Sequence, residues 1–131
     1  MAFVSRLCPL LVGTLMLTAA APGEMLTGVW GGGRATLTLD ATGGTLIEDC
    51  QTTTLGGPVR HTADGRFVAA ARREVHGGGP QAGDVVPTLI DVRLTGRVAA
   101  DRLDLEVARS GAPVERLVLT HGRRLKPIRC Y

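Results

Sequence analysis

Short runs in which apolar and polar residues alternate constrain the fold of this chain more than any other feature. Apart from Gly96, every second residue from Ile90 to Val98 is apolar, and the residues between them are Asp, Arg or Thr. The same alternation runs over residues 35–39 and 103–107. A period of two places successive side chains on opposite faces of an extended chain, so these segments are predicted to be β-strands with one buried face.

Turn residues separate the other predicted strands, which cover residues 26–30, 45–51, 59–61, 66–75, 114–121 and 125–130. A helix competes over 66–75 because the alanines there have good helix propensity, but the Asp64-Gly65 pair before it and the glycines after it favour a hairpin strand. Short connections make neighbouring strands antiparallel. We therefore expect an all-β fold, an up-and-down antiparallel β-barrel of about eight strands, with a β-sandwich as the alternative.

Residues 1–21 have the features of a secretory signal peptide. A single positive charge, Arg6, precedes an apolar run from Leu7 to Leu17, and small residues follow up to Ala21. The run is shorter than the roughly 20 residues that span a bilayer, so cleavage near Ala21 is favoured over a membrane anchor. We expect a secreted or periplasmic monomer in which residues 22–131 form one domain without a membrane span.

The charge of the exported chain is close to balanced. Without Arg6 it has 14 basic and 12 acidic residues, so nucleic acid is not implied as a partner. Its only aromatic residues are Trp30, Phe67 and Tyr131, too few for a platform that stacks on bases or sugars. Residues 122–131 carry four cations and no acid, and a solvated basic last strand is expected there in preference to an anion site.

Two cysteines remain after the signal peptide, Cys50 and Cys130. An even number in a chain bound for an oxidising compartment predicts a disulfide between them. A metal or redox pair is the weaker alternative, because the sequence has no C-x-x-C spacing and no histidine close to either cysteine.

The segment Leu26-Thr27-Gly28-Val29-Trp30 resembles the first-strand motif of the calycins, the superfamily of antiparallel barrels that includes lipocalins and avidins. The resemblance implies a barrel floor in which Gly28 and Trp30 plug the closed end and a basic residue packs over the indole. Arg123, Arg124 and Arg129 are the candidates for that residue, with Arg124 as the chosen one. Biotin binding is not expected, because the chain has one tryptophan and glycines follow it.

The longest predicted loop is the candidate binding loop, with His76, Gly77, Gly78, Gly79 and Asp84 as its site residues. Its first four residues match the H-G-G-G oxyanion loop of esterases, but the only serine after the signal peptide, Ser110, is not in a G-x-S-x-G motif. His61, His76 and His121 lack metal-ligand spacing. No catalytic residue, metal or cofactor is therefore expected.

Together these patterns predict a non-enzymatic binding protein with a calycin-like barrel. The expected ligand is a small apolar molecule inside the barrel or a secreted protein bound by a loop. One alternative is an inhibitor of a secreted protease or lysozyme, which would insert residues 22–25 or the loop 76–87 into the enzyme. The other alternative is a small hydrolase that uses His76.

Overall fold

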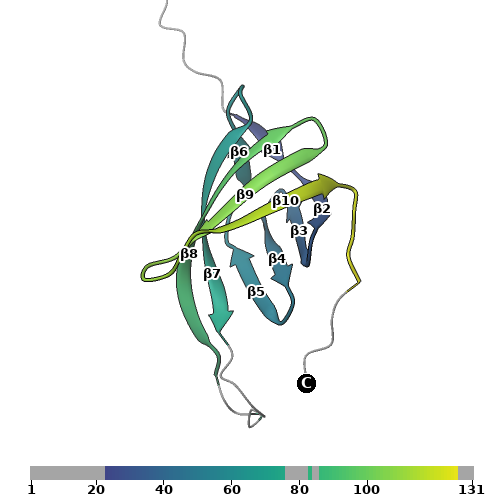
Figure 1. The fold of residues 1–131 in the computed structure, drawn as a ribbon. Helices are drawn as coiled ribbons and strands as arrows, with labels where there is room; N and C mark the ends of the chain where they lie inside the picture. The colour runs from purple at the N-terminus through teal and green to yellow at the C-terminus, as the bar shows by residue number, and fades with distance from the viewer. Residues whose placement is uncertain (1–22, 76–82, 84–85, 127–131) are drawn as a thin grey trace, which may run out of the picture.

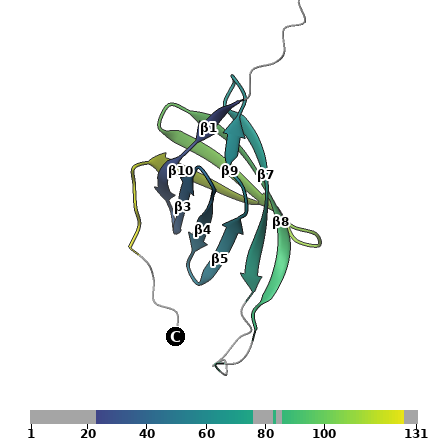
Figure 2. The ribbon, with the colours of Figure 1, turned by 180° about the vertical axis from the view of Figure 1, so that it is seen from behind.

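The computed structural model describes residues 23–75, 83 and 86–126, and every regular element in this part of the chain is a β-strand. The strands are β1 (Glu24–Leu26), β2 (Gly28–Gly32), β3 (Ala35–Asp40), β4 (Gly43–Glu48), β5 (Gln51–Leu55), β6 (Val59–His61), β7 (Arg66–Val75), β8 (Thr88–Ala99), β9 (Arg102–Ala108) and β10 (Glu115–His121). The strands wrap around one interior, which Figures 1 and 2 show from opposite sides.

Eight of these strands form a closed barrel in the order β10-β2-β3-β4-β5-β7-β8-β9, and every neighbouring pair is antiparallel. The order follows the sequence except that β1 and β6 are left out, so the barrel is essentially up-and-down. Short β1 pairs with β6 in a separate two-stranded sheet at one end of the barrel (Figure 1). The all-β barrel prediction is confirmed, and the β-sandwich alternative is wrong.

The glycines that follow Trp30 allow the barrel to close. β10 meets β2 through only two residue pairs, and a Cβ atom on Gly32 would lie 2.1 Å from the Val118 carbonyl oxygen. A Cβ atom on Gly31 would lie 2.1 Å from the Arg123 carbonyl oxygen. Any side chain at these two positions would therefore push the last strand away from the first.

Two predicted strands have different bounds in the structure. The predicted strand 26–30 is divided between β1 and β2, because Gly28 has a φ of 106° that a continuous strand does not allow. The predicted strand 45–51 is wrong at its end: β4 stops at Glu48, and the chain turns at Asp49, which has a φ of 42°. Strand β5, which contains the Thr52-Thr53-Thr54 run, then pairs back on β4.

The core lies inside the barrel and is formed by the inward residues of all these strands. The largest side chains that are fully buried are Leu37, Leu46, Leu94, Leu103, Leu105, Leu119 and Thr53. The ten residues of β7 pair with β8 along their whole length, so the strand prediction for 66–75 is confirmed and the helix alternative is wrong. The Phe67 ring fills the place of the missing side chain of Gly96, since a Cβ there would lie 2.3 Å from the Phe67 Cζ atom.

The structure shows no strand over the described part of the predicted last strand, residues 125–130. Leu125 and Lys126 lie in a segment without strand hydrogen bonding that follows β10, and residues 127–130 lie outside the described residues. This segment is the yellow coil beyond β10 in Figure 1, and it runs along the outside of the barrel.

Candidate functional site

The indole of Trp30 is buried at the end of β10, with 4% of its surface exposed. Its Nε1 donates a 3.2 Å hydrogen bond to the Thr27 carbonyl oxygen. The ring that packs against it belongs to His121, with centroids 4.7 Å apart and planes tilted by 58°. Gly28 leaves room for this histidine, because a Cβ on Gly28 would lie 2.7 Å from the His121 Nε2 atom. Trp30, Gly28 and His121 therefore close this part of the core.

Of the three predicted arginines, only Arg123 and Arg124 belong to the described residues. Arg123 and Arg124 are exposed in the segment after β10, where Arg124 lines a hollow on the outer face of the barrel, and Arg129 is not described. Sequence analysis treated His121 as a solvated residue at a strand end. His121 is exposed, in agreement with that interpretation, and only its contact with the indole was not foreseen, because it depends on the pairing of His121 with Trp30 across β10 and β2.

A charged cluster lies inside the barrel, and sequence analysis missed it. Arg73 on β7 is 6% exposed; its Nε donates to the Thr53 hydroxyl at 3.0 Å, and its Nη2 donates to the Glu48 Oε1 atom at 2.8 Å. Its Nη1 lies 3.5 Å from the Glu115 Oε2 atom. Each of the three guanidinium nitrogens therefore faces a protein group, which satisfies the buried charge.

The two carboxyl groups of this cluster share one cation. Burial raises the pKa of Glu48 to about 8, and the hydrogen bond and the charge of Glu115 add to the increase, while Arg73 opposes it. One guanidinium cannot neutralise two adjacent carboxylates, so the pair retains a proton at pH values where an exposed glutamate is ionised. Because the guanidinium nitrogens of Arg73 already contact protein groups, we interpret the cluster as part of the packed interior and not as a ligand site.

A groove of about 810 Å³ lies on the outer face of β7, β8, β9 and β10. Two exposed valines, Val68 at 58% and Val118 at 54%, are among the residues that line it. The strand register places Val68 beside Thr95 on β8, and Val118 beside Asp104 on β9. The two valines therefore lie at opposite edges of the groove, on β7 and β10, with polar residues of β8 and β9 between them.

Ion pairs border this groove. Arg102 lies 3.0 Å from Asp104, and Arg116 lies 3.3 Å from Glu106. Arg66 at one end lies 3.2 Å from Asp64. Most of the positive charge around the groove is therefore already balanced by neighbouring carboxylates.

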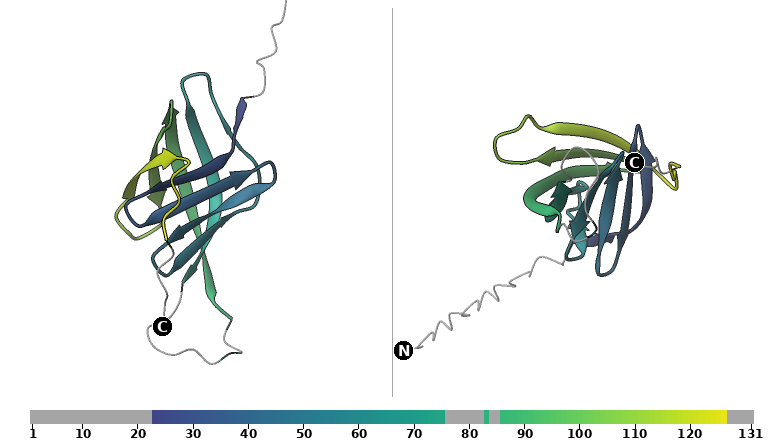
Figure 3. Two further views of the ribbon diagram at one scale, coloured as in Figure 1. Left: turned by 90° about the vertical axis from the view of Figure 1, so that its right-hand side faces the viewer. Right: turned by 90° about the horizontal axis from the view of Figure 1, so that it is seen from below.

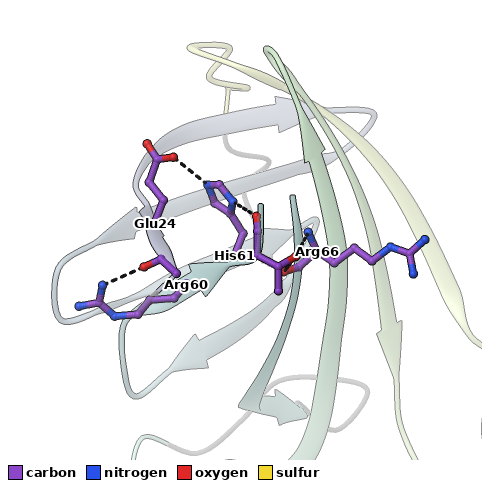
Figure 4. A network of polar contacts seen from close by, with 6 residues as sticks. Glu24, Arg60, His61 and Arg66 are labelled. Carbon is purple, nitrogen blue, oxygen red and sulfur yellow. Dashed lines mark hydrogen bonds and ion pairs between the residues drawn. The ribbon is translucent and has the colours of Figure 1, made fainter. Parts of the chain in front are cut away.

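A polar network connects the start of the described chain to strand β6. The Glu24 carboxylate lies 3.9 Å from the His61 Nε2 atom, and the His61 Nδ1 atom is 2.9 Å from the Thr62 carbonyl oxygen. Arg60 donates to the Gly23 carbonyl oxygen at 3.1 Å. Figure 4 shows Glu24 and Arg60 on one side of His61 and Arg66 on the other. These contacts hold β1 and the preceding Gly23 against β6.

The other predicted site residues are not tested by the structure. Cys50 is exposed in the turn between β4 and β5, and Cys130 lies outside the described residues, so the disulfide stays a prediction. The candidate binding loop residues His76, Gly77, Gly78, Gly79 and Asp84 also lie outside them. Within the described ranges, no three His, Cys, Asp or Glu side chains gather as they would around a metal ion.

The described residues contain no helix with the length and apolar character needed to cross a membrane. Comparisons with protein-family models, with curated proteins and with solved structures give no match for this chain. The fold therefore defines the class to which the protein belongs, a small closed barrel of eight antiparallel strands.

Proposed function

We propose that this protein is an exported, non-enzymatic binding protein with a calycin-like barrel, and that it binds another secreted protein through the groove on β7–β10. The observation that carries the proposal is the contrast between the two faces of the sheet. The inward face is filled by leucines and by the Arg73 cluster, whereas the outward face holds a groove of about 810 Å³ with exposed valines. Because buried leucines fill the described part of the core, the groove is favoured over the interior as the binding site.

The chemistry of the groove favours a protein partner. Protein interfaces have an apolar centre that excludes water and a polar rim that fixes orientation. Here Val68 on β7 and Val118 on β10 supply two apolar contacts, and the Arg102–Asp104 and Arg116–Glu106 pairs supply charged groups between and beside them. The matching partner surface has apolar side chains opposite the two valines and charged side chains of both signs opposite the strands between them.

The calycin-like assignment rests on two features of this chain. The Gly28 and Trp30 motif lies where the last barrel strand meets the first, and the barrel has eight antiparallel strands. The inhibitor alternative is weaker for the N-terminal residues, because 23–26 are held against β6 by the pairing of β1 and by the Arg60 and His61 contacts. A segment held in this way does not extend into the cleft of an enzyme.

The test compares three variants in binding to secreted proteins of the source organism. A protein captured by the wild type is identified and its affinity measured by calorimetry. Val68→Asp and Val118→Asp bury an unpaired charge in the proposed interface and should each weaken binding at least about tenfold, or 1.4 kcal/mol. The control Thr54→Asp adds the same charge at an exposed site on β5 and should leave the affinity unchanged. Equal affinity for all three variants would overturn the proposal.

A further inference from the structure

The chain after β10 is laid across the outer face of β3. It turns at Gly122, whose φ is 79° and whose amide donates to the Val29 carbonyl oxygen at 2.6 Å. The Leu125 amide then donates to the Thr36 Oγ1 atom at 3.3 Å. The left view of Figure 3 shows this yellow segment crossing in front of the early strands. We call residues 123–126 the C-terminal segment.

A hollow of about 320 Å³ lies between the C-terminal segment and the strands β3 and β4. Three cations line it: Arg34 from the turn between β2 and β3, and Arg124 and Lys126 from the segment. One carboxylate, Asp49, lies beside them, with its Oδ2 atom 3.8 Å from the Arg34 Nη1 atom. The three positive charges thus meet a single negative charge, and the hollow has an excess of two positive charges.

The cations of the C-terminal segment differ from the arginines of the groove in their ion pairing. Arg102 and Arg116 each have a carboxylate within 3.3 Å. Among the described residues, no carboxylate lies within ion-pair distance of Arg124 or Lys126, although both face a lined hollow. Three cations that line one hollow raise the positive potential inside it, which favours the binding of an anion.

The hollow also offers neutral hydrogen-bond donors. Thr36 and Thr38 are half-buried on the outward face of β3 and line it. Because the Thr36 oxygen accepts the Leu125 amide, its own hydroxyl hydrogen is free to be donated to a ligand. Ile47, 44% exposed, and the half-buried Leu125 are the apolar residues of the hollow.

We infer that this hollow binds a phosphate or sulfate group. A tetrahedral oxyanion accepts hydrogen bonds on all sides, and arginine, lysine and hydroxyl groups around it supply charge-assisted donors. The C-terminal segment is then one wall of an anion site and not the solvated basic strand that the sequence indicates. The inference is independent of the proposed function, because the groove lies on the outer face of different strands.

Calorimetry at low ionic strength with inorganic phosphate and with sodium sulfate tests the site. Saturable binding with one site per chain is expected for at least one of the two ions. The double variant Arg124→Gln/Lys126→Gln should weaken it at least about tenfold, since it removes two of the three cations that line the hollow. The matched control Arg102→Gln/Arg116→Gln removes the same charge from the groove and should change the affinity less than twofold.

Two further measurements locate the ligand and its source. Thr38→Val, which keeps the Thr36 hydrogen bond to the C-terminal segment, should weaken binding several-fold, and amide chemical shifts should move at Gly33–Thr38 and at residues 124–126. Tighter binding of glycerol phosphate than of inorganic phosphate would identify a phosphate ester as the ligand, and the reverse would identify the free ion. Equal loss in both double variants, or no saturable binding of either ion to the wild type, would overturn the inference.

Discussion

At the scale of single residues, the charged cluster of Arg73 has the largest energetic consequence. Arg73 has almost no contact with water, and its partners come from β4, β5 and β10. Removing one member of a buried ion pair leaves an uncompensated charge, which costs far more than removing an exposed pair. An arginine on the outward face of β7 should therefore contribute much less to the free energy of unfolding.

Arg73→Met should lower the free energy of unfolding by about 3–5 kcal/mol, because it leaves Glu48 and Glu115 without their cation. Urea unfolding at neutral pH measures the change. The control is Arg72→Met on the next residue, an exposed arginine 3.6 Å from Asp91, with an expected loss under about 1 kcal/mol. Similar losses in both variants would contradict the burial of Arg73.

The stability of the barrel should depend on pH through Glu48. Its pKa in the folded protein is about 8, above the ordinary value of 4.5, so folding binds a proton between these pH values. The contribution of this group to the free energy of unfolding is largest below pH 4.5. It decreases by roughly 2–4 kcal/mol as the pH rises toward 8. Glu48→Gln mimics the protonated form and should remove this dependence. Urea unfolding of both proteins from pH 5 to pH 8 tests it, and parallel pH profiles would contradict the assignment.

At the scale of elements, the break between β1 and β2 at Gly28 aligns Trp30 with the last strand. Gly28→Ala should lower the free energy of unfolding by about 1–3 kcal/mol, because alanine is strained at a φ of 106° and its Cβ meets His121. Gly56→Ala, at a glycine with no atom within 4 Å of the added Cβ, is the control and should have little effect. Thermal unfolding compares the two, and an equal effect would argue against a tight contact at Gly28.

The strands that the sequence predicts best are those with clean alternation, namely β3, β8 and β9. Strand β5 escaped prediction because Thr52, Thr53 and Thr54 have the same polarity, so no period is visible although β-branched residues favour strands. The burial of Arg73 was not predicted, because a charged residue on a strand is expected to face outward. Only its position two residues after Ala71 indicates that it faces inward. The groove depends on which outward side chains become neighbours across four strands, which a single strand does not encode.

At the scale of the whole molecule, the predicted disulfide would join the turn after β4 to the end of the chain. The C-terminal segment leads in that direction, because Lys126 and Asp49, the neighbour of Cys50, line the same hollow. The bridge would close a loop of about 80 residues and stabilise the fold by roughly 4.5 kcal/mol in the chain-entropy model. Peptide mapping without reductant should recover Cys50 and Cys130 in one linked peptide. Two free thiols in protein isolated from an oxidising compartment would contradict the prediction.

The central property of the whole molecule is a closed barrel whose interior is filled by its own side chains. Because Trp30 is the single tryptophan, its fluorescence reports on that interior alone. We predict a blue-shifted emission that acrylamide barely quenches and that does not change when an apolar probe such as a naphthylamine dye is titrated in. Emission typical of a solvated indole, or a saturable shift with one dye bound per chain, would contradict the filled interior and the proposal that binding takes place on the outer face.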